Sequence, residues 1–78
     1  MNEITIRTAR GEDAPAIARL AALDEAPVPH GTALLGFVDG ELAAARSLER
    51  SETVADPFRR TAELVDLLDL WAQRGRAA

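Results

Sequence analysis

The sequence predicts a small α/β protein of the α+β kind, with a short and mostly antiparallel sheet that is covered by helices on both faces. The Asp39-Gly40 dipeptide separates two apolar runs, which predicts a type I′ β-hairpin because both turn residues need positive φ. Two further stretches, one on each side of the hairpin, have apolar residues at helical spacing. Both faces of the hairpin are largely apolar, so we expect a helix on each.

Length and composition restrict the classes to which the chain can belong. Its 78 residues form one domain over 1–78, without repeats or linkers. A net charge of -4, from 9 basic and 13 acidic residues, argues against nucleic acids and anionic membranes as partners. The chain has no Cys for disulfides or thiolate chemistry, and no apolar run approaches the ~20 residues that span a bilayer. The polar start MNEITIR is unlike a signal peptide, so we expect a cytoplasmic protein.

The N-terminal part predicts a strand followed by a helix. Residues 3–9 alternate, with Ile4 and Ile6 on one face, and their β-branched side chains favour a strand. A helix then opens at 11–13, where acidic residues suit the positive end of the helix dipole, and continues to about Leu23. The Pro- and Gly-containing stretch 26–31 ends this helix and forms a loop.

The hairpin joins strands over 32–38 and 41–48. Pairing Val38 with Glu41 predicts one face formed by Leu35, Phe37, Leu42 and Ala44, and a second formed by Leu34, Gly36, Ala43 and Ala45. The three consecutive alanines leave room for a helix to approach closely.

The C-terminal part predicts a short strand over 52–55 and then a helix from Phe58 to about Arg74. We expect Asp56 to cap this helix, Pro57 to occupy its first position and Gly75 to stop it. Its apolar stripe is broad and comprises Leu64, Val65, Leu67, Leu68 and Trp71. The expected order is therefore strand, helix, two hairpin strands, short strand, helix.

This order and three sequence stretches resemble the N-terminal part of the GNAT N-acetyltransferase superfamily. Residues 4–17 (ITIRTARGEDAPAI) are similar to the family's first strand and helix, and residues 35–44 (LGFVDGELAA) to its second and third strands. Residues 54–60 (VADPFRR) resemble the fourth strand and the V-x-P-x-x-R lead into the acetyl-CoA loop. The resemblance implies a GNAT-like N-terminal half, with Arg59 and Arg60 as the residues that would contact the cofactor phosphate.

The acetyl-CoA loop itself departs from the family. Setting Arg60 on the family's Arg places Glu63 and Val65 where two glycines let the backbone approach the pyrophosphate. A carboxylate there repels phosphate by about 4 kcal/mol per charge pair at ~4 Å and an effective dielectric of about 20. The family's fifth strand and its general-acid Tyr have no counterpart. The resemblance is therefore to a truncated and degenerate member, and we expect no cofactor.

Several other polar residues suggest chemistry, but a simpler interpretation of each is preferred. The only His, His30, lies in a Pro/Gly loop and is expected to be solvated, and Glu52 lies roughly where some family members have a general base. The basic pair Arg59 and Arg60 is interpreted as making local ion pairs. Four carboxylates are assigned to solvated surface and not to a metal site, namely Asp24, Glu25, Asp66 and Asp69.

The predicted function is that of a non-catalytic GNAT-like module that acts through self-association or binding to another protein. Strand 52–55 has an open edge, and the last helix is apolar over a wide arc. A homodimer or a protein partner would then cover the predicted interface of Val54, Leu64, Leu68 and Trp71. The alternative is a minimal N-acetyltransferase or acyl-CoA-binding protein that dimerisation completes, with acetyl-CoA as cofactor. A third interpretation is a regulatory, antitoxin-like partner of a larger protein, so enzymatic activity stays open.

Overall fold

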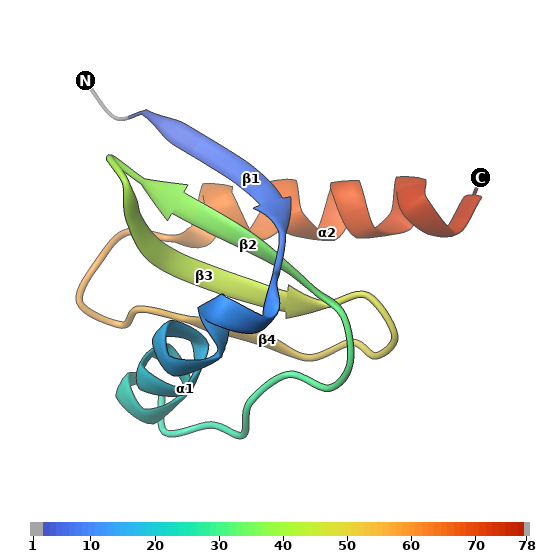
Figure 1. Cartoon of the computed structure of the whole chain (residues 1–78). Helices are drawn as coiled ribbons and strands as arrows, with labels where there is room; N and C mark the ends of the chain where they lie inside the picture. The colour runs from blue at the N-terminus through green and yellow to red at the C-terminus, as the bar shows by residue number, and fades with distance from the viewer. Residues whose placement is uncertain (1–2, 78) are drawn as a thin grey trace.

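The structure, a computed structural model, describes residues 3–77 and is built on a four-stranded antiparallel sheet with the spatial order β1-β2-β3-β4 (Figure 1). The strands are β1 (Ile4–Thr8), β2 (Ala33–Val38), β3 (Glu41–Ser47) and β4 (Thr53–Ala55). A 3₁₀ turn η1 (Gly11–Asp13) leads into helix α1 (Ala14–Leu23) after β1, and helix α2 (Ala62–Ala77) follows β4. The predicted α+β class with a short antiparallel sheet is confirmed.

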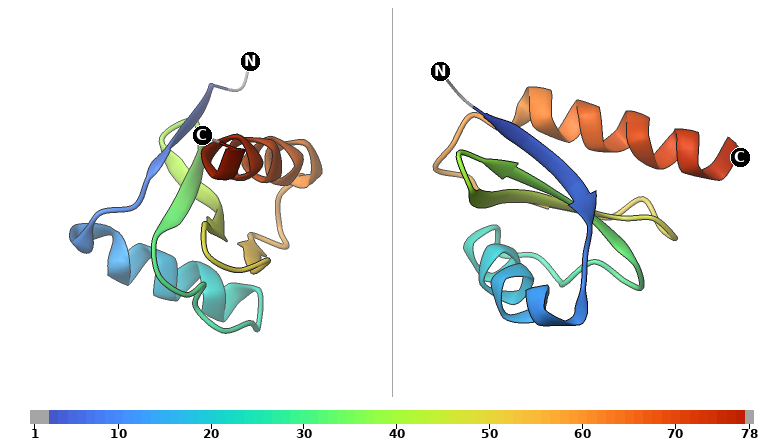
Figure 2. Two further views of the ribbon diagram at one scale, coloured as in Figure 1. Left: turned by 90° about the vertical axis from the view of Figure 1, so that its right-hand side faces the viewer. Right: turned by 45° about the horizontal axis from the view of Figure 1, so that its top comes forward.

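The sheet lies between the two helices (Figure 2). An apolar cluster lies beneath each helix. The α1 cluster comprises Ile17, Leu20, Ala21, Leu35, Ala45 and Val54. The α2 cluster comprises Leu34, Ala43, Ala44, Leu64, Leu68 and Ala72. The prediction that helices cover both faces is therefore confirmed, and it explains why the hairpin strands are apolar on both sides. Within residues 3–77, no helix combines the length and apolar content that crossing a bilayer requires.

The hairpin turn forms as expected. Val38 pairs with Glu41, and the two turn residues have positive φ, 51° at Asp39 and 83° at Gly40. Glycine adopts this conformation without steric cost, and Asp tolerates it better than most residues, as the type I′ prediction requires.

Beyond the turn, a β-bulge changes which side chains share a face. Phe37 pairs with Leu42, but Gly36 pairs with Ala44, so Ala43 is an extra residue on β3. Ala43 and Ala44 therefore both join the α2 cluster, while Ala45 joins the α1 cluster. The predicted faces of Ala44 and Ala45 are wrong because strict alternation fails where two residues oppose one.

Helix α2 begins at Ala62, so the predicted start at Phe58 is wrong. Asp56 does not cap this helix. Its Oδ1 accepts the Phe58 N–H at 2.8 Å and its C=O accepts the Arg59 N–H at 3.2 Å, which closes a turn before the helix. The helix continues past Gly75 to Ala77, so the predicted stop is also wrong; a single glycine within a helix costs only about 1 kcal/mol.

Candidate functional site

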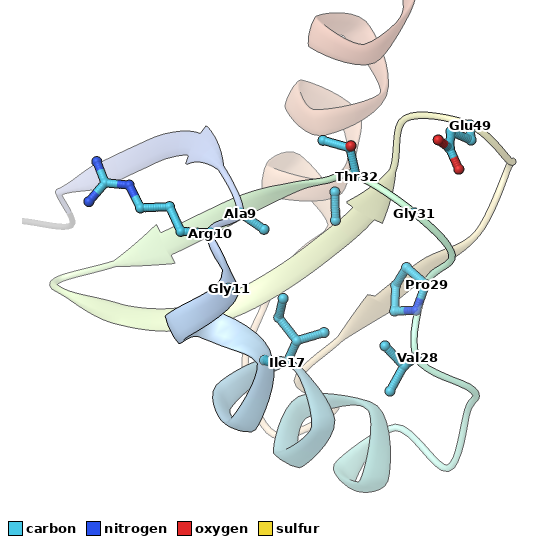
Figure 3. Close-up of a pocket in the computed structure, with 11 residues that line it drawn as sticks. Ala9, Arg10, Gly11, Ile17, Val28, Pro29, Gly31, Thr32 and Glu49 are labelled. Carbon is cyan, nitrogen blue, oxygen red and sulfur yellow. The ribbon is translucent and has the colours of Figure 1, made fainter.

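A hollow of about 470 Å³ lies where the end of β1 and the start of η1 face the segment 28–33 (Figure 3). Its apolar lining consists of Ala9, Ala14, Ile17, Val28, Pro29 and Ala33. Arg10 and Glu49 lie at opposite sides of the hollow, and the Arg10 side chain extends away from it. The Glu49 carboxylate lies over Gly31, so a Cβ at that position would collide with Glu49 Oε2. Such a lining suits a small apolar group and supplies contact, not bond-breaking chemistry.

Next to this hollow, the Asp13 carboxylate accepts three hydrogen bonds that hold the end of β1 against the start of α1. Two nitrogens of Arg7 in β1 each donate to Asp13 at 2.8 Å, and the backbone N–H of Arg10 donates at 2.7 Å. Chiefly through the Arg7 guanidinium, and then through the Arg10 N–H, these donors hold the pKa of Asp13 well below its usual range, while the pKa of Arg7 is raised. The pair joins β1 to the start of α1 and was not predicted from the sequence.

His30 and Glu52, which are 22 positions apart in the sequence, lie together in the structure. His30 Nδ1 is 2.9 Å from Glu52 Oε1, and the His30 backbone N–H donates to the same oxygen at 2.9 Å. Mainly through the backbone donor, and then through the ring, these contacts lower the pKa of Glu52. A carboxylate that orients an imidazole is the arrangement of a general base, but the His30 side chain is 55% exposed. In this structure the pair fastens the loop 26–31 to the start of β4.

The basic pair before α2 has two different environments. Arg59 lies between two carboxylates, with Glu41 at 3.0 Å and Asp56 at 3.6 Å, in agreement with the local ion pairs expected for it. Arg60 is exposed and shares with Arg59 a hollow of about 350 Å³ beside α2. Glu63, in the first turn of the helix, lies on the same wall. The charges around this hollow are therefore mixed.

The four carboxylates assigned to solvated surface divide into two kinds. Glu25 and Asp66 are exposed, as expected. Asp69 instead accepts the Nε–H of the buried Arg46 at 2.6 Å, so its assignment to a purely solvated face is wrong. Asp24 Oδ2 accepts the Ala55 N–H at 3.2 Å and so occupies one donor of β4. Within residues 3–77, no group of three or more acidic or His side chains is arranged to hold a metal ion.

Asp24 covers part of the open edge of the sheet at β4. Hydrogen bonds from Ser47 N to Glu52 O and from Asp56 N to Ala43 O flank the β3–β4 ladder, so Ala55 points its N–H away from β3. The Asp24 carboxylate covers this donor. β4 is an outer strand, as predicted, but it is short and partly covered; β1 is the outer strand on the other side.

Three of the four predicted interface residues lie in the interior. Val54, Leu64 and Leu68 are buried between the sheet and the helices, whereas Trp71 is 49% exposed. Leu70 and Leu67, which were not singled out for an interface, are 47% and 36% exposed on the same helix. On α2, the apolar surface available to a partner is therefore the outer side of the helix; elsewhere Phe58, Val28, Ile4 and Leu23 are also exposed. Comparisons with known proteins found no matching family model, curated protein or solved structure.

Proposed function

We propose that this chain is a small, non-catalytic GNAT-like module that acts by binding a protein surface through the outer side of α2. The observation that supports this best is the exposed apolar stripe, which we define as Leu67, Leu70 and Trp71. These positions are three and four apart, so their side chains are neighbours on one side of the helix. Contiguous exposed apolar surface on a small domain is typical of interaction sites.

The packing of the inner side of α2 strengthens this argument. The inner side of α2 is already satisfied, because Leu64, Leu68 and Ala72 fill the cluster against the sheet. The apolar stripe is therefore additional to what the fold needs, and replacing it should spare the core. Trp is also among the residues that contribute most to binding energy at protein interfaces.

The GNAT-like part of the proposal is supported by the order of the elements and by the sequence stretches quoted above. A strand, a helix, a hairpin, a short strand and a second helix follow one another along the chain, and the four strands lie in chain order across the sheet.

Sedimentation velocity of the purified chain, from about 1 µM to about 500 µM, tests the proposed function. We expect the average mass to rise above 8.4 kDa with concentration, and the triple variant with Leu67, Leu70 and Trp71 replaced by Ser to stay monomeric and folded. A wild-type chain that remains monomeric throughout overturns self-association and leaves only binding to a different protein.

The alternative, an acyl-CoA-binding protein, is favoured by one observation, the hollow beside α2 that holds Arg59 and Arg60. Calorimetric titration with acetyl-CoA tests it directly. Micromolar binding that is lost in Arg60→Ala would favour the alternative, whereas no heat at millimolar ligand would leave the association proposal.

A further inference from the structure

We infer that the partner of the apolar stripe is a second copy of this chain, with the two α2 helices packed antiparallel about a two-fold axis. This inference rests on the proposed function and specifies its partner. It is drawn from the arrangement of charge along the exposed side of α2, in addition to its apolar character.

The exposed side of α2 has acidic residues near the start of the helix, apolar residues in the middle and a basic residue near the end. Glu63 is exposed in the first turn, Leu67 and Leu70 follow, and Arg74 is exposed near the other end. Glu63 and Arg74 are eleven residues apart, about three helical turns, so they lie on the same side of the helix and about 16 Å apart. Glu63, Asp66, Leu67 and Leu70 together line one shallow hollow on this surface.

This order is self-complementary when the helix meets its own copy antiparallel. A two-fold axis that crosses the helix midway between Leu68 and Asp69 places Glu63 of one copy opposite Arg74 of the other, and Arg74 opposite Glu63. The same axis places Leu67 opposite Leu70 twice, so these leucines meet at the centre, and it places Trp71 beside them opposite Asp66 of the other copy. Opposite charges then form the rim, as in an isologous interface.

A parallel arrangement of the two helices does not have these properties. It would place Glu63 against Glu63 and Arg74 against Arg74, which repel. The dipoles of two helices that lie side by side attract each other when the helices are antiparallel and repel when they are parallel. The charge pattern therefore selects the antiparallel two-fold dimer.

The interface is small, since it consists of one helix side from each copy. We therefore expect weak association, with a dissociation constant of about 10 to 500 µM, in the range of transient contacts. Because rim charges contribute, association should weaken as salt rises.

Charge reversal tests the pairing. In the homodimer of Glu63→Arg, two arginines face each other at each of the two contacts between positions 63 and 74. In the homodimer of Arg74→Glu, two glutamates face each other at the same contacts. We expect each single variant to self-associate about tenfold more weakly than the wild type, because two exposed pairs each change from attraction to repulsion. An equimolar mixture of the two variants restores both pairs, so it should associate about as tightly as the wild type.

The matched control is Arg19→Glu, an exposed arginine on α1 that lies outside the proposed contact. It makes the same charge change as Arg74→Glu and should leave self-association unchanged. Circular dichroism verifies that each variant is folded.

Three outcomes are distinguishable by sedimentation velocity. Recovery of association in the mixture, and not in either variant alone, is the expected result. Association of the wild type that neither variant weakens would overturn the α2 pairing but leave association through another surface, such as the outer edge of β1. A monomeric wild type would overturn the second copy as the partner, whereas binding of a different protein through the apolar stripe, the other form of the proposed function, would not be affected.

Discussion

Arg46 in β3 and Asp69 in α2 join the sheet to its covering helix, with Arg46 Nε donating to Asp69 Oδ1 at 2.6 Å. Arg46 is only 7% exposed, so its charge has lost most of its water. Nη1 of the same Arg46 guanidinium donates to the Ser47 carbonyl, so a second nitrogen of the side chain also has an acceptor. The burial of this cation is therefore compensated largely by one carboxylate from the helix.

Removing that carboxylate should destabilise the fold. We expect Asp69→Ala to lower the free energy of unfolding by about 1 to 3 kcal/mol, because Arg46 would remain buried without its counter-charge. Asp66→Ala, on the exposed side of the same helix, should change it by less than about 0.5 kcal/mol. Urea unfolding followed by circular dichroism measures both; equal midpoints for the two variants would show that the ion pair adds nothing.

Close approach of α2 to β2 depends on the absence of a side chain at Gly36. A Cβ there would stand 2.7 Å from Leu64 Cδ1, so Gly36→Ala should cost about 1 to 3 kcal/mol through overpacking. Gly11→Ala is the control, because a Cβ at that position meets nothing within 4 Å. The same substitution at Gly36 in a Leu64→Ala background should cost much less, and additive effects would contradict the steric explanation.

The donors around Asp13 predict a stability that depends on pH. A carboxyl whose pKa is lowered by folding adds stability above its unfolded pKa of about 4, and this is lost as the pH falls through the folded value. Asp13→Asn should therefore be less stable than the wild type near pH 7, with a difference that shrinks as the pH falls below about 4. Urea unfolding at several pH values measures this; a difference that grows on acidification would reverse the sign of the argument.

The two donors on Glu52 can be separated experimentally. His30→Ala removes the ring but keeps the backbone N–H, which is the larger cause of the lowered pKa. We expect the pKa of Glu52, followed by NMR titration of its side-chain carboxyl carbon, to rise part of the way toward its ordinary value. A return to the full ordinary value would mean that the loop no longer holds its position without the ring.

The fold could be predicted from the sequence where one local rule applied without a competitor. Asp39-Gly40 between apolar runs has few structural interpretations other than a hairpin. At residues 56–58 two rules competed, since an Asp-Pro pair suits both a helix start and a turn, and the Asp56 contact with the Phe58 N–H decided for the turn. Hydrophobic patterning could not reveal the bulge, because Ala43, Ala44 and Ala45 are identical residues.

The polar pairs were predicted less well because they join residues far apart in the sequence. Arg46 and Asp69 are 23 positions apart, and His30 and Glu52 are 22 apart. A charged residue in an apolar strand, as Arg46 is, was the one available sign that a buried partner was needed. The exposed stripe of α2 was only partly predicted, since amphipathic spacing alone does not show where the sheet ends and solvent begins.

The bulge in β3 has a consequence for how this chain can change length. Deleting Ala43 would leave Leu42 opposite Phe37, Ala44 opposite Gly36 and Ala45 opposite Leu35, so every existing β2–β3 pair survives. Only the extra residue and the Asp56 N–H bond to its carbonyl would disappear, and the strand would straighten. Elsewhere in a strand, loss of one codon exchanges the two faces of the sheet. Here the alanine triplet is a site where the gene can lose three bases at the loss of one small core residue, Ala43, while every other core residue keeps its pairing partner.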